Sequence, residues 1–293
     1  MRLFNIYSRN LVSCFILFLL IQTNVWSQSS DNKFSWQKRW FIGASGGPAQ
    51  TNISSDETSV ISGVVMTGKN SYCLSVDAGY FFSKYFGIST GIGLSPYSTQ
   101  LSLDPYSNSL DTIDSEDESY ERRISGNNIN ETQKIYFLDI PVILNFQCPF
   151  SKALGFYLQG GVNMAIHVGN NYSSSGTFSY SGYYPAYNVV LENILYEGFK
   201  SNVKNDVSGE LKVKTLNPEL IATGGFYFLN QKHFQISAGF FYKSMLSDIS
   251  DYSPVESFQL STHENQIRSF MEGSDKSTAS SMGIMISLRY YIR

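Results

Sequence analysis

One pentapeptide in this 293-residue sequence has the spacing of a nucleophilic active site. Gly43-Ala44-Ser45-Gly46-Gly47 matches the G-x-S-x-G pattern, in which a sharp turn between a strand and a helix presents a serine hydroxyl. Here the pattern falls within or at the end of a strand-like stretch, and no helix follows. The histidines that could act as bases, His167, His233 and His263, show no triad or metal-ligand spacing. We therefore predict that the protein is not an enzyme and has no catalytic residue, metal or cofactor.

Carboxylates gather in a second stretch, which could bind calcium. Calcium prefers carboxylate oxygens, but the spacing does not follow the EF-hand pattern, and no glycine lies where that loop must turn. A solvated acidic loop is therefore the prediction for Asp111, Asp114, Glu116, Asp117, Glu118 and Glu121.

A third stretch, from Val168 to Pro218, is predicted to be a long loop rich in Ser, Gly, Asn and Tyr. Tyrosine offers a large contact area at a modest cost in entropy, so this composition resembles that of binding surfaces. The alternative is a loop that folds over and packs on itself. The hypothesis of a ligand-binding site rests on Tyr172, Tyr180, Tyr183, Tyr184 and Tyr187.

Strands must position these residues, because side-chain type alternates strictly from Tyr72 to Leu94. Leu74 and Val76 belong to an apolar face, and Ser75 and Asp77 belong to a small or polar face. A short turn divides this stretch into a hairpin of two strands. The same alternation predicts six further strands, at residues 39–47, 135–146, 154–167, 220–229, 233–242 and 282–292.

The connections between these eight strands alternate between short and long. Those after the first, third, fifth and seventh strands run from about twenty to about fifty residues, and the others are short. An even number of strands joined in this way is typical of an up-and-down barrel with short periplasmic turns and long extracellular loops. Strands of about ten residues also match a tilted crossing of a bilayer. The sequence therefore predicts an all-β fold, an eight-stranded antiparallel transmembrane β-barrel.

A soluble barrel would show the same alternation with its apolar face turned inward. The lumen of eight strands only just holds its own side chains, so packing every Leu, Ile, Val and Phe inside would overfill it. The apolar face is therefore expected to contact lipid. Aromatic residues near the strand ends, among them Trp40, Tyr72, Tyr97 and Tyr290, are expected to form two interfacial girdles.

Three charged residues, Asp77, Asp139 and Arg289, fall on the lumen face of the predicted barrel. Buried charges are costly unless they pair. We predict that Arg289 bridges one or both carboxylates, as a plug that stabilises the lumen or in a gating role. Pro141 lies in mid-strand, where a proline must sit at a bulge or lose a ladder hydrogen bond, and we predict a bulge.

The N-terminal segment has the features of a secretory signal peptide. Arg2 and Arg9 precede an apolar run from Leu11 to Ile21, which is too short to span a membrane, and cleavage is expected after Ser27. The expected organisation is a signal peptide at residues 1–27, a periplasmic lead-in at 28–37 and the barrel at 38–293.

Charge and cysteine content narrow the function classes further. The mature chain would carry about five more acidic than basic residues, so nucleic acid is not an expected partner. Cys73 and Cys148 remain in an oxidising compartment, but the predicted topology places them at opposite ends of the barrel. That separation is too large for a disulfide, and we predict two free thiols.

The segment from Tyr136 to Phe146, YFLDIPVILNF, resembles the aromatic-Leu-acid-Ile-Pro strand of PorT-like outer-membrane barrel proteins of gram-negative bacteria. The glycine-rich hairpin before it and the tyrosine-rich final strand are similar to the same family. The resemblance implies an eight-stranded barrel in the outer membrane. The namesake of the family is associated with protein secretion, a role that a shared fold does not transfer. The loops here are longer than the resemblance would suggest.

These patterns together predict a non-enzymatic outer-membrane β-barrel that binds a partner, or serves an envelope or secretion complex, through its extracellular loops. The expected partners are outer-membrane lipid and a protein or glycan at the loops, with no nucleic acid. The alternatives are an outer-membrane lipid hydrolase and a narrow passive pore.

Overall fold

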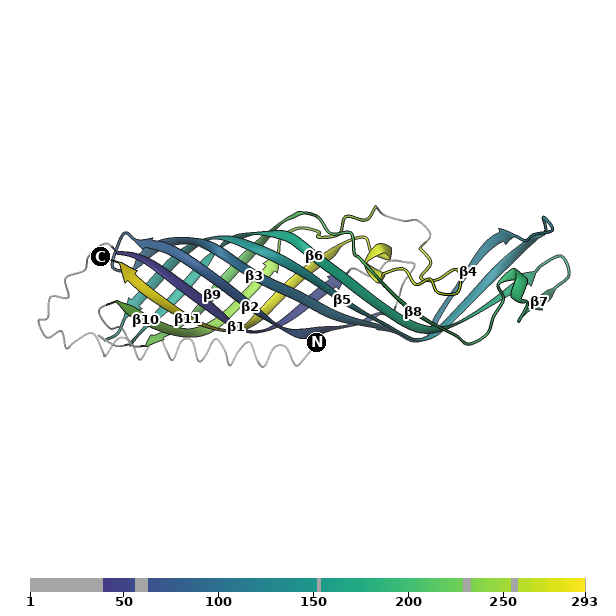
Figure 1. Cartoon of the computed structure of the whole chain (residues 1–293), viewed down its shortest axis with the longest axis horizontal. Coiled ribbons are helices and arrows are strands. Elements are labelled where there is room, and N and C mark those ends of the chain that lie inside the picture. Colours follow the sequence, from purple (N-terminus) through teal and green to yellow (C-terminus); the bar gives the residue numbers. More distant parts are fainter. Residues whose placement is uncertain (1–38, 56–62, 152–153, 229–232, 254–257, 293) are drawn as a thin grey trace, which may run out of the picture. The chain divides into compact units, whose positions relative to one another are not determined.

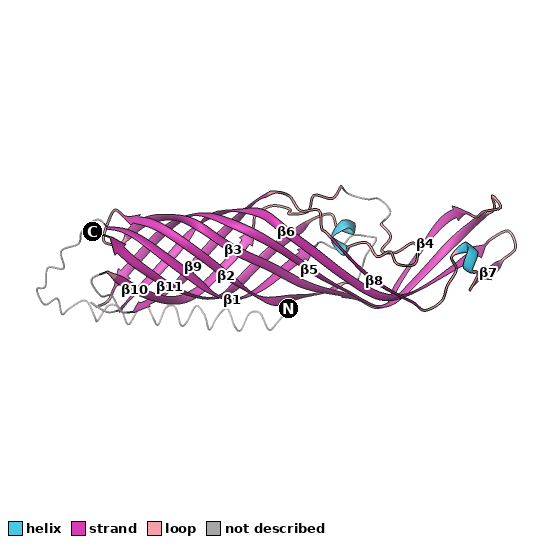
Figure 2. Ribbon diagram, in the orientation of Figure 1, coloured by secondary structure: helices cyan, strands magenta, loops and turns pink. Residues whose placement is uncertain are grey.

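The computed structural model describes residues 39–55, 63–151, 154–228, 233–253 and 258–292, which are mainly β-strand (Figures 1 and 2). Within these ranges the helices are two short 3-10 helices, η2 (Leu195–Glu197) and η3 (Phe270–Gly273). The expected signal peptide, its cleavage site after Ser27 and the lead-in at 28–37 lie outside the described residues.

Eight of the strands close into a barrel. Each pairs antiparallel with its neighbours in the order β1-β2-β3-β5-β6-β9-β10-β11, and β11 returns to β1 with Trp40 opposite Ile292 and Ser55 opposite Ser277. The predicted eight-stranded antiparallel up-and-down barrel is therefore confirmed. The strands are β1 (Arg39–Ser55), β2 (Val65–Phe81), β3 (Phe86–Leu103), β5 (Ser119–Pro149), β6 (Leu154–Tyr184), β9 (Leu216–Phe228), β10 (Phe234–Met245) and β11 (Ser277–Ile292).

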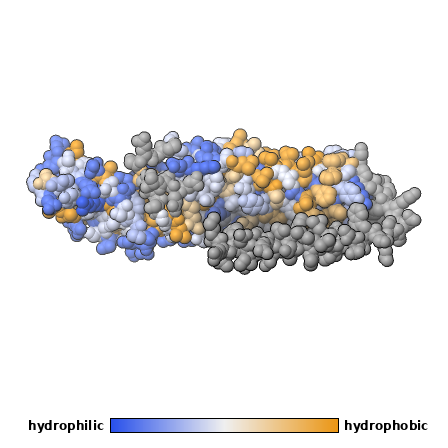
Figure 3. Space-filling view, turned by 180° about the vertical axis from the view of Figure 1, so that it is seen from behind, coloured by the Kyte–Doolittle hydropathy of each residue, from blue (hydrophilic) through white to orange (hydrophobic). Residues whose placement is uncertain are grey.

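The apolar residues that alternate along each strand lie on the outside of the barrel, and the small or polar residues between them lie on the inside. Leu74, Ile92 and Leu144 on the outer wall are 54%, 57% and 65% exposed. Asp139 and Arg289, on the other face of their strands, are 4% and 7% exposed. The outer wall of the barrel is accordingly hydrophobic over much of the face shown in Figure 3. Apolar side chains on the outside and charges on the inside are the arrangement that lipid requires and water does not.

Exposed aromatic side chains mark both ends of this apolar wall. Trp40, Phe86 and Phe234 lie near the strand ends joined by the short turns, and Trp40 packs on the Tyr80 ring at 4.9 Å between centroids. Tyr136, farther along its strand, is also exposed. These rings suit the two interfaces of a bilayer.

Two local predictions are wrong. Tyr97 is not in a girdle but is 1% exposed in the lumen, because it shares the strand parity of Gly93 and Ser95. Pro141 causes no bulge: the registers on both sides of it continue unshifted, and the β3 ladder instead leaves Ile140 and Pro141 without partners. Proline has no N–H to donate, so pairing with β3 is lost here although the strand contains no extra residue.

Glycine makes room for the aromatic rings that fill the lumen. A Cβ at Gly79 would overlap the ring of Phe41, and one at Gly155 would overlap the phenol of Tyr227. Phe41 and Tyr227 are 1% and 2% exposed. Small residues on the inner face thus leave space for a few large aromatic rings, which a narrow barrel requires.

The sheet continues beyond the barrel in β4 (Tyr106–Ile113), β7 (Val189–Leu191), β8 (Val203–Gly209) and the parts of β5 and β6 that pair with them. We call these strands together the extension. β5 and β6 are 31 residues each and pair with one another over almost their full length. β4 pairs with β5, and β8 and β7 pair with β6. The extension lies past the barrel end in Figure 1.

The prediction of a loop from Val168 to Pro218 is therefore wrong for its first part, which is strand up to Tyr184. The predicted acidic loop is likewise a hairpin, formed by β4 and the start of β5. Beyond the apolar wall these strands contact no lipid, so their outward-facing positions need no hydrophobic side chain. The apolar alternation used to locate strands therefore ends before the strands do.

Candidate functional site

A lysine that the sequence analysis missed lies at the centre of the lumen charges. Lys243 Nζ is 2.5 Å from Asp139 Oδ2, 2.8 Å from Ser95 Oγ and 3.9 Å from Glu219 Oε2. Glu219 in turn accepts hydrogen bonds from Tyr97 Oη and, at 2.6 Å, from Asn163 Nδ2. Two buried carboxylates therefore share one buried ammonium group.

The predicted lumen cluster is divided by this arrangement. Arg289 lies 3.9 Å from Asp77, donates to Asn145 Oδ1 at 3.1 Å and covers the Phe41 ring at 4.6 Å from its centroid. Asp139 pairs with Lys243 instead. The structure thus brings Arg289 to one of its two proposed carboxylates, and the role of the three residues stays a prediction.

Strand parity could have revealed the missed pair. Lys243 lies one residue beyond the predicted end of its strand, and Glu219 one residue before the predicted start of its own. Lys243 shares the inward parity of Ser237 and Phe241, and Glu219 that of Thr223. Extending each predicted strand by one residue would have placed both charges in the lumen.

The lumen leaves little open space among the described residues. A cavity of about 50 Å³ lies between the two charge groups and is lined by residues that include Asp139, Lys243 and Arg289. That is room for a few water molecules. Farther along, Tyr97 and Phe137 pack with Ile53 and Met271, all of them almost fully buried. The described part of the interior is therefore a packed core.

A buried carboxylate holds the β10–β11 loop against the extension. Glu131 accepts hydrogen bonds from Ser174 Oγ at 2.6 Å, Ser269 Oγ at 2.7 Å, Gln133 Nε2 at 2.6 Å and the Phe270 N–H at 3.2 Å. Burial raises the pKa of Glu131, and these four bonds oppose the rise. The segment 258–273 thereby packs Phe258, Leu260, Ile267 and Phe270 onto the sheet.

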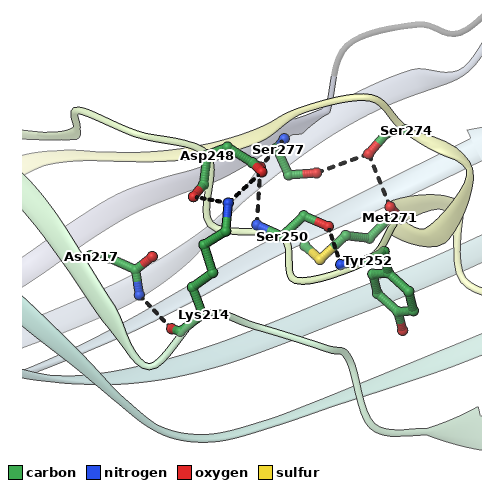
Figure 4. A network of polar contacts seen from close by, with 8 residues as sticks. All are labelled: Lys214, Asn217, Asp248, Ser250, Tyr252, Met271, Ser274 and Ser277. Atoms are coloured by element: carbon green, nitrogen blue, oxygen red, sulfur yellow. Dashed lines mark hydrogen bonds and ion pairs between the residues drawn. The ribbon is translucent and has the colours of Figure 1, made fainter. Parts of the chain in front are cut away.

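A polar network joins two connections at the rim, the barrel end from which the extension continues (Figure 4). They are the connection between β8 and β9 and the one between β10 and β11. Lys214 Nζ donates to Asp248 Oδ2 at 2.8 Å, and the N–H groups of Ser250 and Ser277 donate to Asp248 Oδ1 at 3.0 and 2.9 Å. Asn217 donates to the Lys214 carbonyl at 2.7 Å. Asp248 thus fastens the residues after β10 to the start of β11.

Acidification is expected to loosen this rim. Burial raises the pKa of Asp248, but the hydrogen bonds from Lys214, Ser277 and Ser250 outweigh it and leave the pKa lowered. A carboxyl group with a lowered folded-state pKa adds stability above its unfolded value, about 3.9, and this is lost as pH falls through the folded value. Amide exchange at Ser277, corrected for the intrinsic rate, should therefore rise a few-fold at acid pH. The rise should be absent in Asp248→Asn and present in the exposed control Asp251→Asn; equal profiles in all three would contradict the assignment.

The two hairpins of the extension meet at one surface, the tip, made of residues 110–121 and 184–197. Tyr184 donates to Asp114 Oδ2 at 2.9 Å, Tyr187 donates to Glu118 Oε1 at 2.7 Å, and Ser115 donates to Glu197 Oε1 at 2.7 Å. These three hydrogen bonds join the β4–β5 turn to the chain around β7.

The five tyrosines proposed for ligand binding are divided among different environments. Tyr172 and Tyr180 donate to the carbonyls of Ile267 and His263, and Tyr180 and Tyr184 are buried. Tyr183 lies under the Arg123 guanidinium at 4.2 Å, and Tyr187 is 62% exposed. Ligand binding stays a prediction for the set, and exposure favours it most for Tyr187.

A buried arginine supports the tip. Arg122 is 5% exposed and donates to the carbonyls of Glu197, Gly198 and Thr262 at 3.2, 3.2 and 3.1 Å. Its guanidinium also covers the ring of Phe199 at 5.6 Å from the centroid. One side chain therefore joins helix η2 to the β10–β11 loop.

The serine and the histidines weighed as catalytic residues make the following contacts. Ser45 lies within β1 and its hydroxyl contacts Ser75 Oγ at 2.6 Å. His167 contacts Asn170 at 2.8 Å, His233 contacts the Tyr291 carbonyl at 3.1 Å and His263 contacts Thr262 at 2.9 Å.

Other expected features can be checked in the same residues. Within the described ranges, no group of His, Cys, Asp and Glu is arranged to hold a metal ion, and no helix is long and apolar enough to cross a membrane. Cys73 and Cys148 are both free, which confirms the predicted pair of thiols.

Comparison with known proteins fits this architecture. Residues 26–250 match the model of the outer membrane protein beta-barrel domain family. The chain belongs to this family. Its barrel strands are thus outer-membrane strands, and in such barrels the short turns face the periplasm and the long connections face outward. The extension and its tip are accordingly extracellular.

Two solved bacterial proteins show a low overall similarity to this chain. Ail of Yersinia pestis, in complex with the heparin analogue sucrose octasulfate, is 12% identical, with 86% of this chain and 99% of that chain covered and a TM-score of 0.29. OprG of Pseudomonas aeruginosa is 14% identical, with 87% and 96% covered and a TM-score of 0.35. No curated protein matches the chain.

Proposed function

We propose that this outer-membrane barrel is a non-enzymatic anchor that holds a rigid extracellular binding surface, the tip, away from the membrane. The observation that carries the proposal is the exposure of large apolar side chains far from lipid. Tyr196, Leu195, Tyr187 and Ile113 are 84%, 71%, 62% and 61% exposed. Apolar residues gathered on an extracellular surface mark an interaction site.

The rest of the extension supports this reading, because it is built to be stiff. β5 and β6 are each a single strand that runs from the barrel into the extension, and apart from register shifts at 127–130 and 136–137 their pairing continues to Glu121 and Tyr183. Arg122 and the hydrogen bonds of Tyr184 and Tyr187 fix the loops at the end. A surface ordered before binding loses less entropy when a partner docks.

The other functions considered have less support. A passive pore needs an open path, and the lumen cavity has a volume of about 50 Å³. A lipid hydrolase needs a base near Ser45, whose hydroxyl contacts Ser75. The YFLDIPVILNF strand supports a place among PorT-like barrels, and with it an envelope or secretion-accessory role in which the bound partner is a protein.

Site-specific crosslinking in intact cells tests the proposal. A photoreactive amino acid at Tyr196 should give discrete adducts with a partner, because this side chain is the most exposed ring of the tip. The matched control is the same amino acid at Ser125, which is exposed on β5 but outside the tip. The adduct yield at Tyr196 should exceed that at Ser125 by about tenfold if the tip carries the contact. Equal yields at the two positions would contradict the proposal.

A further inference from the structure

Strand β7 leaves one edge open at the tip. It pairs with β6 through Val189, Val190 and Leu191, and no described residue pairs with its other edge. Val189 and Val190 are 40% and 44% exposed. Natural proteins usually protect such an edge by keeping the strand very short or with lysine, proline or a bulge, because it is a template for another strand. β7 is short, with three residues, but it contains no lysine, proline or bulge.

The residues that follow β7 in the chain present apolar side chains in a fixed position. Leu195 and Tyr196 belong to helix η2, which ends at Gly198 in the left-handed conformation with φ of 72°. The Arg122 guanidinium donates hydrogen bonds to the Glu197 and Gly198 carbonyls. Two exposed apolar side chains, Leu195 and Tyr196, are therefore held in place shortly after β7 in the chain.

The charge around the tip selects the partner. The ranges 110–123 and 184–198 contain eight acidic residues against two basic ones, Arg122 and Arg123, and Arg122 is buried. An acidic surface attracts a cationic partner and repels sulfated glycans and anionic lipid headgroups. The acidic residues are Asp111, Asp114, Glu116, Asp117, Glu118, Glu121, Glu192 and Glu197.

We propose that the open edge of β7 accepts an extended, cationic segment of a protein as an added strand. Main-chain hydrogen bonds to β7 align the segment, Leu195 and Tyr196 contact its apolar side chains, and the carboxylates of the tip face its lysines and arginines. Three residues of edge give few main-chain bonds, so the side-chain contacts supply much of the affinity. This inference rests on the proposed function and names the partner class of the same surface.

Selection from a displayed library of random decapeptides tests it, with the full chain in lipid nanodiscs as the target. We expect enrichment of peptides that carry net positive charge and alternate apolar with polar residues. Binding should fall about tenfold with Val190→Lys, which protects the edge, and stay within about twofold with the matched Val190→Thr. Methylation of alternate backbone nitrogens in a selected peptide should abolish its binding, because it removes the donors that strand addition needs.

The other outcomes separate the two proposals. Tip-dependent peptides that are acidic, or that tolerate backbone methylation, would overturn strand addition and leave the proposed binding function intact. Tip-dependent binding of heparin or of anionic lipid vesicles, in place of cationic peptides, would overturn the assignment of the partner. If no selected peptide distinguishes the wild-type chain from Leu195→Ser/Tyr196→Ser, strand addition is wrong, and the crosslinking at Tyr196 decides on the proposed function.

Discussion

Replacing Lys243 with methionine is expected to destabilise the barrel by about 3–5 kcal/mol, because it leaves two buried carboxylates without their shared cation. The Asp139 and Glu219 side chains are 5% and 0% exposed, so solvent does not screen the loss. The measurement is the free energy of unfolding in urea, followed by the β-sheet circular dichroism of the protein in lipid vesicles.

A triple variant provides the control. Lys243→Met combined with Asp139→Asn and Glu219→Gln removes both uncompensated charges, and it should recover most of the loss. Arg289→Met should cost less than Lys243→Met, since Asp77 is 3.9 Å away and its side chain is 15% exposed. Equal unfolding free energies for wild type and Lys243→Met would show that the lysine does not neutralise the lumen.

Replacing Arg122 with methionine is expected to release the tip while leaving the barrel folded. Three half-buried carbonyl groups, of Glu197, Gly198 and Thr262, would lose a charged donor, at a local cost of about 3 kcal/mol. Hydrogen exchange should therefore accelerate by about a hundredfold or more at the amides of Gly198 and Phe199, and stay unchanged in β1 and β11.

Two variants make this test specific. Arg122→Lys keeps the charge but lacks the planar fork that reaches three carbonyls, so it should rescue little. Arg123→Met removes an exposed neighbour whose ion pair with Glu121 is worth about 1 kcal/mol or less, and it should leave exchange at Gly198 nearly unchanged. Acceleration by Arg123→Met equal to that by Arg122→Met would contradict the role assigned to Arg122.

The sequence was most informative where lipid constrains it. Leu74, Ile92 and Leu144 alternate with small or polar residues because one face of each strand contacts hydrocarbon and the other a narrow lumen. Together with the limited lumen volume and the alternating lengths of the connections, that rule predicts the closed barrel. The same rule predicted that Asp77, Asp139 and Arg289 lie inside.

Prediction failed where that constraint ends. β6 was expected to end at His167, yet it runs to Tyr184, because strands outside the membrane no longer need an apolar face. The pairing of Asp139 with Lys243 depends on the register of β10 across the lumen, which no local pattern specifies. The tip likewise depends on Arg122 meeting Glu197 and Gly198 from distant parts of the chain, so its rigidity could not be inferred from the tyrosine-rich composition.

Labelling of single cysteines on intact cells tests the central claim most directly. In a chain with Cys14, Cys73 and Cys148 replaced, a membrane-impermeant maleimide should label Tyr196→Cys at the tip, and it should not label Lys84→Cys in the short turn between β2 and β3 until the outer membrane is opened. Labelling of Lys84→Cys and protection of Tyr196→Cys in intact cells would place the extension on the periplasmic side and contradict the account.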